Sequence, residues 1–97
     1  MATRRIALTL FSSNTCSLCS VVKTTLDRVQ QKVPFTLSTI DIHSPECPKD
    51  LAQAYMFDIP VVHLNGQFLL QHRVGEDKLE EALKKYQATG VVERIKT

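Results

Sequence analysis

The sequence predicts a single α/β domain with the element order β-α-β-α-β-β-α, in which three helices pack on a four-stranded mixed sheet. Two observations support this fold class. Apolar runs typical of strands alternate along the chain with segments whose apolar residues recur at helical spacing. The pair Asn65-Gly66 lies between two apolar runs, and this is the strongest short signal for a β-hairpin, because both turn positions need a positive φ.

The first half of the chain is predicted to form a strand–helix–strand unit. Residues 5–11 are apolar on both faces, as in a strand covered on both sides, and residues 12–15 supply turn and N-cap side chains. From residue 16 or 17 to about 31 the apolar residues recur at steps of four, four and three, which predicts a helix. Residues 35–42 are β-branched and apolar enough for a second strand, which we expect to lie parallel to the first.

A short helix and the hairpin follow. The helix is predicted over residues 49–57, after a loop with two prolines. Three of its residues are expected to face inward: Leu51, Ala54 and Tyr55. The hairpin strands are predicted over residues 61–64 and 67–70, on either side of the Asn-Gly turn.

The last helix has the clearest pattern. Over residues 76–88 its apolar positions are spaced i, i+3, i+4 and i+7, and Glu–Lys pairs four residues apart support the opposite face. Gly90 is a suitable C-cap. We expect residues 1–97 to form one domain, with 91–97 as a flexible tail.

Composition excludes several classes of protein. The net charge of +2 is small and the basic residues are scattered, so we expect no nucleic-acid partner. Apolar runs all fall short of the roughly 20 residues that cross a membrane, so we expect no membrane partner either. An odd count of 3 cysteines does not suit a secreted disulfide scaffold, which indicates a reducing compartment such as the cytoplasm. The basic N-terminus has the composition of a transit peptide, which keeps a mitochondrial address open, although we interpret it as part of the fold.

The chemistry is expected at Cys16 and Cys19. The Cys-X-X-Cys motif lies where a predicted strand ends and a helix begins. Unpaired N–H groups and the positive end of the helix dipole stabilise a thiolate there, which lowers the thiol pKa. The spacing of three residues brings the second thiol within disulfide reach. The sequence therefore predicts that Cys16 attacks a substrate disulfide and that Cys19 resolves the mixed disulfide.

The chain resembles glutaredoxins and thioredoxins from about Ile6 to Ala88. Three features carry the resemblance: the Cys-X-X-Cys segment after the first strand, Ile59-Pro60-Val61 at the third strand, and Asn65-Gly66 followed by Gly75 before the last helix. The resemblance implies a thioredoxin-like fold and a thiol–disulfide oxidoreductase active in cell redox homeostasis. It also implies that Pro60 is cis beside the cysteines and that the Ile59 backbone binds substrate or glutathione.

The glutathione site of this family is matched less well. Many glutaredoxins have a lysine where this chain has Ser13, and their Gly-Gly-acidic element is reduced to Gly75-Glu76-Asp77, about four residues later than usual. We retain these three residues as candidate glutathione ligands. The stretch from Pro60 to Val74 is similar to the small glutaredoxin-like subgroup rather than to a standard glutaredoxin. We expect no bound cofactor or metal, glutathione as a reductant or co-substrate, disulfide-containing or glutathionylated protein partners, and a monomer.

Other interpretations stay open at this point. Cys16, Cys19, His43 and Cys47 are four residues of the types that bind zinc, although a predicted helix and strand separate the first two from the others. Cys47 is interpreted as a bystander surface thiol or as a third redox thiol. His72 and Arg73 are either a solvated hairpin end or ligands for an acidic group. A thioredoxin-fold binding module with little catalytic activity is the alternative function.

Overall fold

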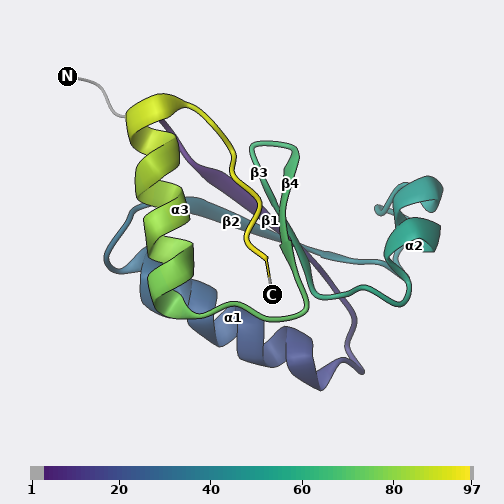
Figure 1. Cartoon of the computed structure of the whole chain (residues 1–97). Coiled ribbons are helices and arrows are strands. Elements are labelled where there is room, and N and C mark those ends of the chain that lie inside the picture. The colour runs from purple at the N-terminus through teal and green to yellow at the C-terminus, as the bar shows by residue number, and fades with distance from the viewer. Residues whose placement is uncertain (1–3, 97) are drawn as a thin grey trace.

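The computed structural model describes residues 4–96 and confirms the predicted element order (Figure 1). The elements are β1 (Ala7–Ser12), α1 (Ser17–Gln30), β2 (Thr36–Asp41), α2 (Lys49–Tyr55), β3 (Val61–Leu64), β4 (Gln67–Gln71) and α3 (Glu76–Thr89). Predicted and observed boundaries agree to within about two residues, which is as close as element assignments usually agree with one another. The α/β class and the three helices are therefore as expected.

The sheet is mixed, with the strand order β2-β1-β3-β4. Strand β1 is parallel to β2 and antiparallel to β3, and β3 and β4 form the antiparallel hairpin. At the turn, Asn65 has φ 49° and Gly66 has φ 84°. The Asn65 amide also ties the turn to the chain before β1, because it accepts from the Ala7 N–H at 2.8 Å and donates to the Arg5 carbonyl at 3.0 Å.

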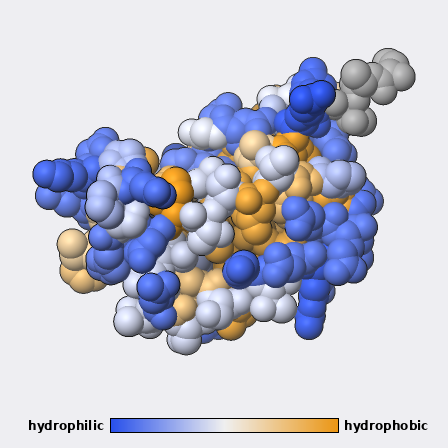
Figure 2. All heavy atoms as spheres, turned by 180° about the vertical axis from the view of Figure 1, so that it is seen from behind, coloured by the Kyte–Doolittle hydropathy of each residue, from blue (hydrophilic) through white to orange (hydrophobic). Residues whose placement is uncertain are grey.

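Each face of the sheet has its own hydrophobic core. Alternate residues of β1 explain this, since Leu8 and Leu10 join the larger core whereas Phe11 joins the smaller one. The larger core contains the buried residues of α1 and α3, and the smaller core contacts α2, which Figure 1 shows apart from the other two helices. On the surface seen from behind, hydrophobic residues gather in the middle of the face, with hydrophilic residues around them (Figure 2).

Two local predictions are wrong. The N-cap of α1 is Cys16 itself and not a residue of the 12–15 turn. In α2, Ala54 is exposed, and Ala52 packs on the core together with Leu51 and Tyr55. Residues 51, 52 and 55 lie on one side of the helix, and this side packs against the sheet. Successive residues are rotated by about 100° around the helix axis, so Ala54 lies on a different side.

The C-terminal segment packs against the domain. Helix α3 ends at Gly90, which has φ 77° and is the C-cap predicted from the sequence. Val92 and Ile95 then pack against the larger core, and the Ile95 N–H donates to the Leu69 carbonyl at 2.8 Å. We expected a flexible tail after Gly90. The structure instead has a segment that is docked as far as residue 96, because its apolar side chains pack on the core.

The N-terminal segment with the composition of a transit peptide is described only in part, because residues 1–3 lie outside the described residues whereas Arg4 and Arg5 lead into β1. Across residues 4–96, each helix is too short or too polar to cross a membrane.

Candidate functional site

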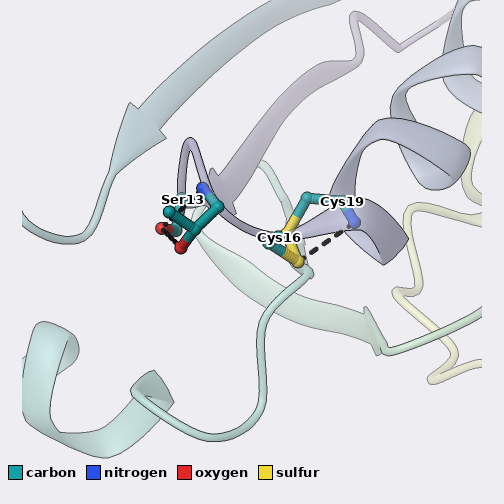
Figure 3. Close-up of a disulfide and its surroundings, with 4 residues drawn as sticks. Ser13, Cys16 and Cys19 are labelled. Carbon is teal, nitrogen blue, oxygen red and sulfur yellow. Dashed lines mark hydrogen bonds between the residues drawn. A yellow bond between two sulfur atoms is a disulfide. The ribbon is translucent and has the colours of Figure 1, made fainter.

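Cys16 and Cys19 form a disulfide at the start of α1 (Figure 3). Their Cα atoms are 5.3 Å apart. The turn that ends β1 positions the first cysteine, since the Cys16 N–H donates to the Ser13 carbonyl at 3.1 Å. Cys16 is then the N-cap residue, with φ −96° and ψ 104°, and its sulfur accepts the Cys19 N–H at 3.1 Å. The sequence motif is therefore a bonded cysteine pair in space, with its first sulfur at the helix N-terminus.

The two sulfurs have different surroundings. Cys19 is only 4% exposed, whereas Cys16 is half-buried. The first turn of α1 contains no acidic residue, so no carboxylate of that turn offsets the positive end of the helix dipole at Cys16. A Cys16 thiolate is thus stabilised by an N–H donor and by the dipole, and it is the more accessible of the two sulfurs.

The segment that enters β3 lies beside this pair. The peptide bond between Ile59 and Pro60 is cis, as the resemblance implies. Because Phe11 pairs with Val61, Pro60 lies next to the end of β1, which leads directly into the Cys16 turn. The Ile59 N–H already donates to the Tyr55 carbonyl at 3.1 Å. A substrate contact at Ile59 would therefore use its carbonyl group.

The candidate acidic element forms the N-terminus of α3. Gly75 is the N-cap, with φ −85° and ψ 151°, and no side chain caps the helix there. Glu76 and Asp77 occupy the first turn, where their negative charges interact favourably with the positive end of the helix dipole. A Cβ on Gly75 would meet no atom within 4 Å. Neither the backbone conformation nor packing within the chain requires glycine at this position.

A groove of about 820 Å³ lies between α1 and the start of α3. We call it the redox groove. Its lining comes from three segments: Leu18, Val21 and Val22 of α1; His72, Arg73, Val74, Gly75 and Lys78; and Ile95 and Lys96. Leu18 lies between the two cysteines in the sequence, so the groove reaches the first turn of α1, although neither cysteine is among its lining residues. His72 connects it to the cis-proline, because the His72 N–H donates to the Pro60 carbonyl at 2.8 Å.

The structure brings some predicted site residues together and leaves others apart. Gly75 lines the redox groove, as do His72 and Arg73, whereas Glu76 and Asp77 are not among its lining residues. His72 adopts a positive φ of 67°, and its Nε2 lies 3.9 Å from an Asp58 carboxylate oxygen. Ile95 and Lys96 were not predicted as site residues. The apolar spacing of Val91, Val92 and Ile95 is the signal that could have indicated their docking.

Cys47 is not a surface thiol. It is 4% exposed and belongs to the smaller core with Phe11, Ile42 and Val61. Burial raises the pKa of the Cys47 thiol, and the carboxylates of Asp50 and Asp41 raise it further. The prolines on either side suggest a loop, as predicted, but the loop folds onto the sheet and carries the thiol inside.

The zinc interpretation has no support in the geometry. In the part of the chain that the structure describes, no three residues of the His, Cys, Asp and Glu types are close enough to hold a metal ion.

The fold and the cysteine pair define a class, that of thioredoxin-fold proteins with a Cys-X-X-Cys site. The family model described as Glutaredoxin-like domain (DUF836) matches residues 7–84, and the chain belongs to this family.

Solved structures agree on the fold. Protein Ne2328 from Nitrosomonas europaea superposes with a TM-score of 0.70 at 21% identity, over 86% of this chain and 96% of that one. Thioredoxin-2 of the malaria parasite gives 0.64 at 22% identity, over 88% and 85%. Thioredoxin O2 from Arabidopsis thaliana gives 0.63 at 14% identity, over 86% and 76%. At these identities the likeness concerns the thioredoxin-like fold.

Proposed function

We propose that the protein is a thiol–disulfide oxidoreductase in which Cys16 attacks and Cys19 resolves. The observation that carries the proposal is the position of the Cys16 sulfur, at the N-cap of α1 and 3.1 Å from the Cys19 N–H. An N-terminal amide and the helix dipole stabilise the thiolate, which is the reactive form. The difference in burial between the two cysteine residues supports these roles, because the attacking thiol must be accessible.

The electrons balance within one cycle. The Cys16 thiolate attacks one sulfur of a substrate disulfide, a mixed disulfide forms, and the other substrate sulfur leaves as a thiolate that takes up a proton. Cys19, deprotonated, then attacks the Cys16 sulfur. The intramolecular disulfide forms and the second substrate thiol is released. Two electrons have moved from the pair to the substrate, and two molecules of a thiol such as glutathione would restore the dithiol.

Substrate reduction by cysteine variants tests this assignment. The wild-type dithiol should reduce a small disulfide or insulin, and Cys16→Ser should abolish the reaction. Cys19→Ser should instead accumulate a mixed disulfide that mass spectrometry detects. Cys47→Ala is the matched control, because it removes a thiol that lies in the smaller core, and it should retain the activity. A wild type that is no more active than Cys16→Ser would indicate the binding-module alternative.

Glutathione is the proposed co-substrate, used with modest selectivity. The Ser13 hydroxyl lies 3.1 Å from that of Thr15 within the turn, so it offers no counterpart to the lysine of many glutaredoxins. Loss of one exposed ion pair costs only about 0–1 kcal/mol, and the basic residues of the redox groove supply other positive charges. We expect thioltransferase activity below that of a standard glutaredoxin. Comparing rates on a glutathionylated peptide and a plain disulfide tests this, and a strong preference for the former would contradict it.

A further inference from the structure

The C-terminal segment is held beside the redox groove by contacts from several elements. Its backbone is attached to β4 through the Ile95–Leu69 hydrogen bond. The Arg94 guanidinium lies 4.7 Å from the centre of the Phe68 ring, a cation–π contact. Lys85 of α3 forms an ion pair with Glu93. Residues 93–96 therefore have a defined place, and the groove wall that they form is part of the fold.

Part of the groove that Ile95 and Lys96 line is apolar. Val21 of α1 lines the same groove and is 60% exposed, so its aliphatic side chain is available to a ligand there. Leu18 and Ile95 add to this apolar surface. Concave surfaces lined by aliphatic side chains and a few polar groups are typical of small-molecule sites.

The charged residues of the groove have one sign. Arg73, Lys78 and Lys96 line it, and none of the lining residues is acidic. The protein as a whole has a net charge of only +2, so this grouping does not simply follow from composition. A concave site lined by one sign of charge attracts ligands of the opposite sign. The apolar and cationic lining residues together fit a disulfide substrate that has an aliphatic part and a carboxylate.

We propose that the segment Glu93–Lys96 determines substrate specificity, and that Lys96 contacts a carboxylate of the disulfide substrate bound in the redox groove. The proposal rests on the oxidoreductase function proposed above and names the substrate class as carboxylate-bearing disulfides. Lys96 takes no part in electron transfer. It raises the rate of attack by Cys16 by binding the acidic part of the substrate.

A charge-reversal experiment with three disulfides tests the proposal. The dithiol form is mixed with glutathione disulfide, which carries carboxylates, with neutral 2-hydroxyethyl disulfide, or with cationic cystamine, and oxidation of the pair is followed in a single turnover. Lys96→Glu should slow the reaction with glutathione disulfide about five-fold, the effect of one exposed ion pair, and Lys96→Ala should slow it less. The neutral disulfide should react equally with all variants, and cystamine should react faster with Lys96→Glu. Added salt should slow the wild-type reaction with glutathione disulfide and leave the reaction with the neutral disulfide unchanged.

Lys49→Glu is the matched control, because it makes the same charge change on α2, outside the lining of the redox groove. An equal effect of Lys49→Glu, an unchanged rate for Lys96→Glu, or an equal loss with the neutral disulfide would overturn the proposal.

Binding of S-methylglutathione, which cannot react, separates this proposal from the function on which it rests. Amide signals of Gly75 and Ile95 should shift in NMR titrations of the wild type, and Lys96→Glu should weaken the binding. Such binding without any disulfide reduction would overturn the oxidoreductase function and leave the groove assignment intact. Disulfide reduction without shifts at these amides would overturn the groove assignment alone.

Discussion

The Tyr55 hydroxyl lies 2.9 Å from Nε2 of His63, and this hydrogen bond joins α2 to β3. The two rings also lie edge to face, with centroids 5.7 Å apart, and His63 lies 4.8 Å from the Phe11 ring. The imidazole is thus a half-buried member of an aromatic group in the smaller core. Its position matters for the cysteines because the same α2–β3 connection contains the cis-proline.

Stability should depend on pH through His63. Burial lowers the pKa of His63 from its ordinary value of 6.5, so the unfolded chain binds a proton at this residue more readily than the folded protein. The free energy of unfolding should therefore fall as the pH drops below about 6.5. His63→Gln, which does not titrate, should lose less stability between pH 7 and pH 5. Parallel denaturation curves for the two proteins across this range would contradict the prediction.

The three thiols should differ in reactivity. After reduction, iodoacetamide at pH 7 should label Cys16 first, because it is the most accessible and its thiolate is stabilised by the helix. Cys19 and Cys47 should react slowly, since each is only 4% exposed and the pKa of Cys47 is raised. Mass spectrometry of peptides gives the order, and labelling in denaturant provides the control in which all three react alike. Faster labelling of Cys47 than of Cys16 would contradict the assignment of roles.

Gly75 and Gly90 should respond differently to substitution. Gly90 has φ 77°, a left-handed conformation that costs a residue with a Cβ about 1 kcal/mol or more. Gly90→Ala should lower the free energy of unfolding by about that amount, measured by denaturant titration. The added Cβ would also come within 2.7 Å of Arg4 Nε, but that flexible side chain can move away.

Gly75→Ser should instead leave stability nearly unchanged. The φ of Gly75 is ordinary, there is open space for a Cβ, and serine differs from glycine at an N-cap by only a few tenths of a kcal/mol. Because Gly75 lines the redox groove, the added side chain should reduce reactivity with glutathione disulfide more than with 2-hydroxyethyl disulfide. Equal rates for wild type and variant on both substrates would show that substrates do not reach this end of the groove.

Prediction from the sequence succeeded where a feature depends on neighbouring residues. The positions of α1 and α3 follow from apolar spacing, the hairpin from Asn65-Gly66, and the C-cap from Gly90. Prediction failed where a feature depends on how a helix packs against the sheet. Ala54 was expected to face inward and is exposed. The orientation of α2 about its own axis decides which side chains contact the sheet, and it places Ala52 there together with Leu51 and Tyr55.

The cysteine pair could be predicted from local sequence. A Cys-X-X-Cys segment at a strand–helix junction brings Cys16 and Cys19 within disulfide reach through local geometry alone. The burial of Cys47, and the position of Lys96 in the same groove as Leu18, could be seen only in the folded chain. Burial and the surroundings of a charge depend on segments far apart in the chain, which come together only when the sheet and its helices pack.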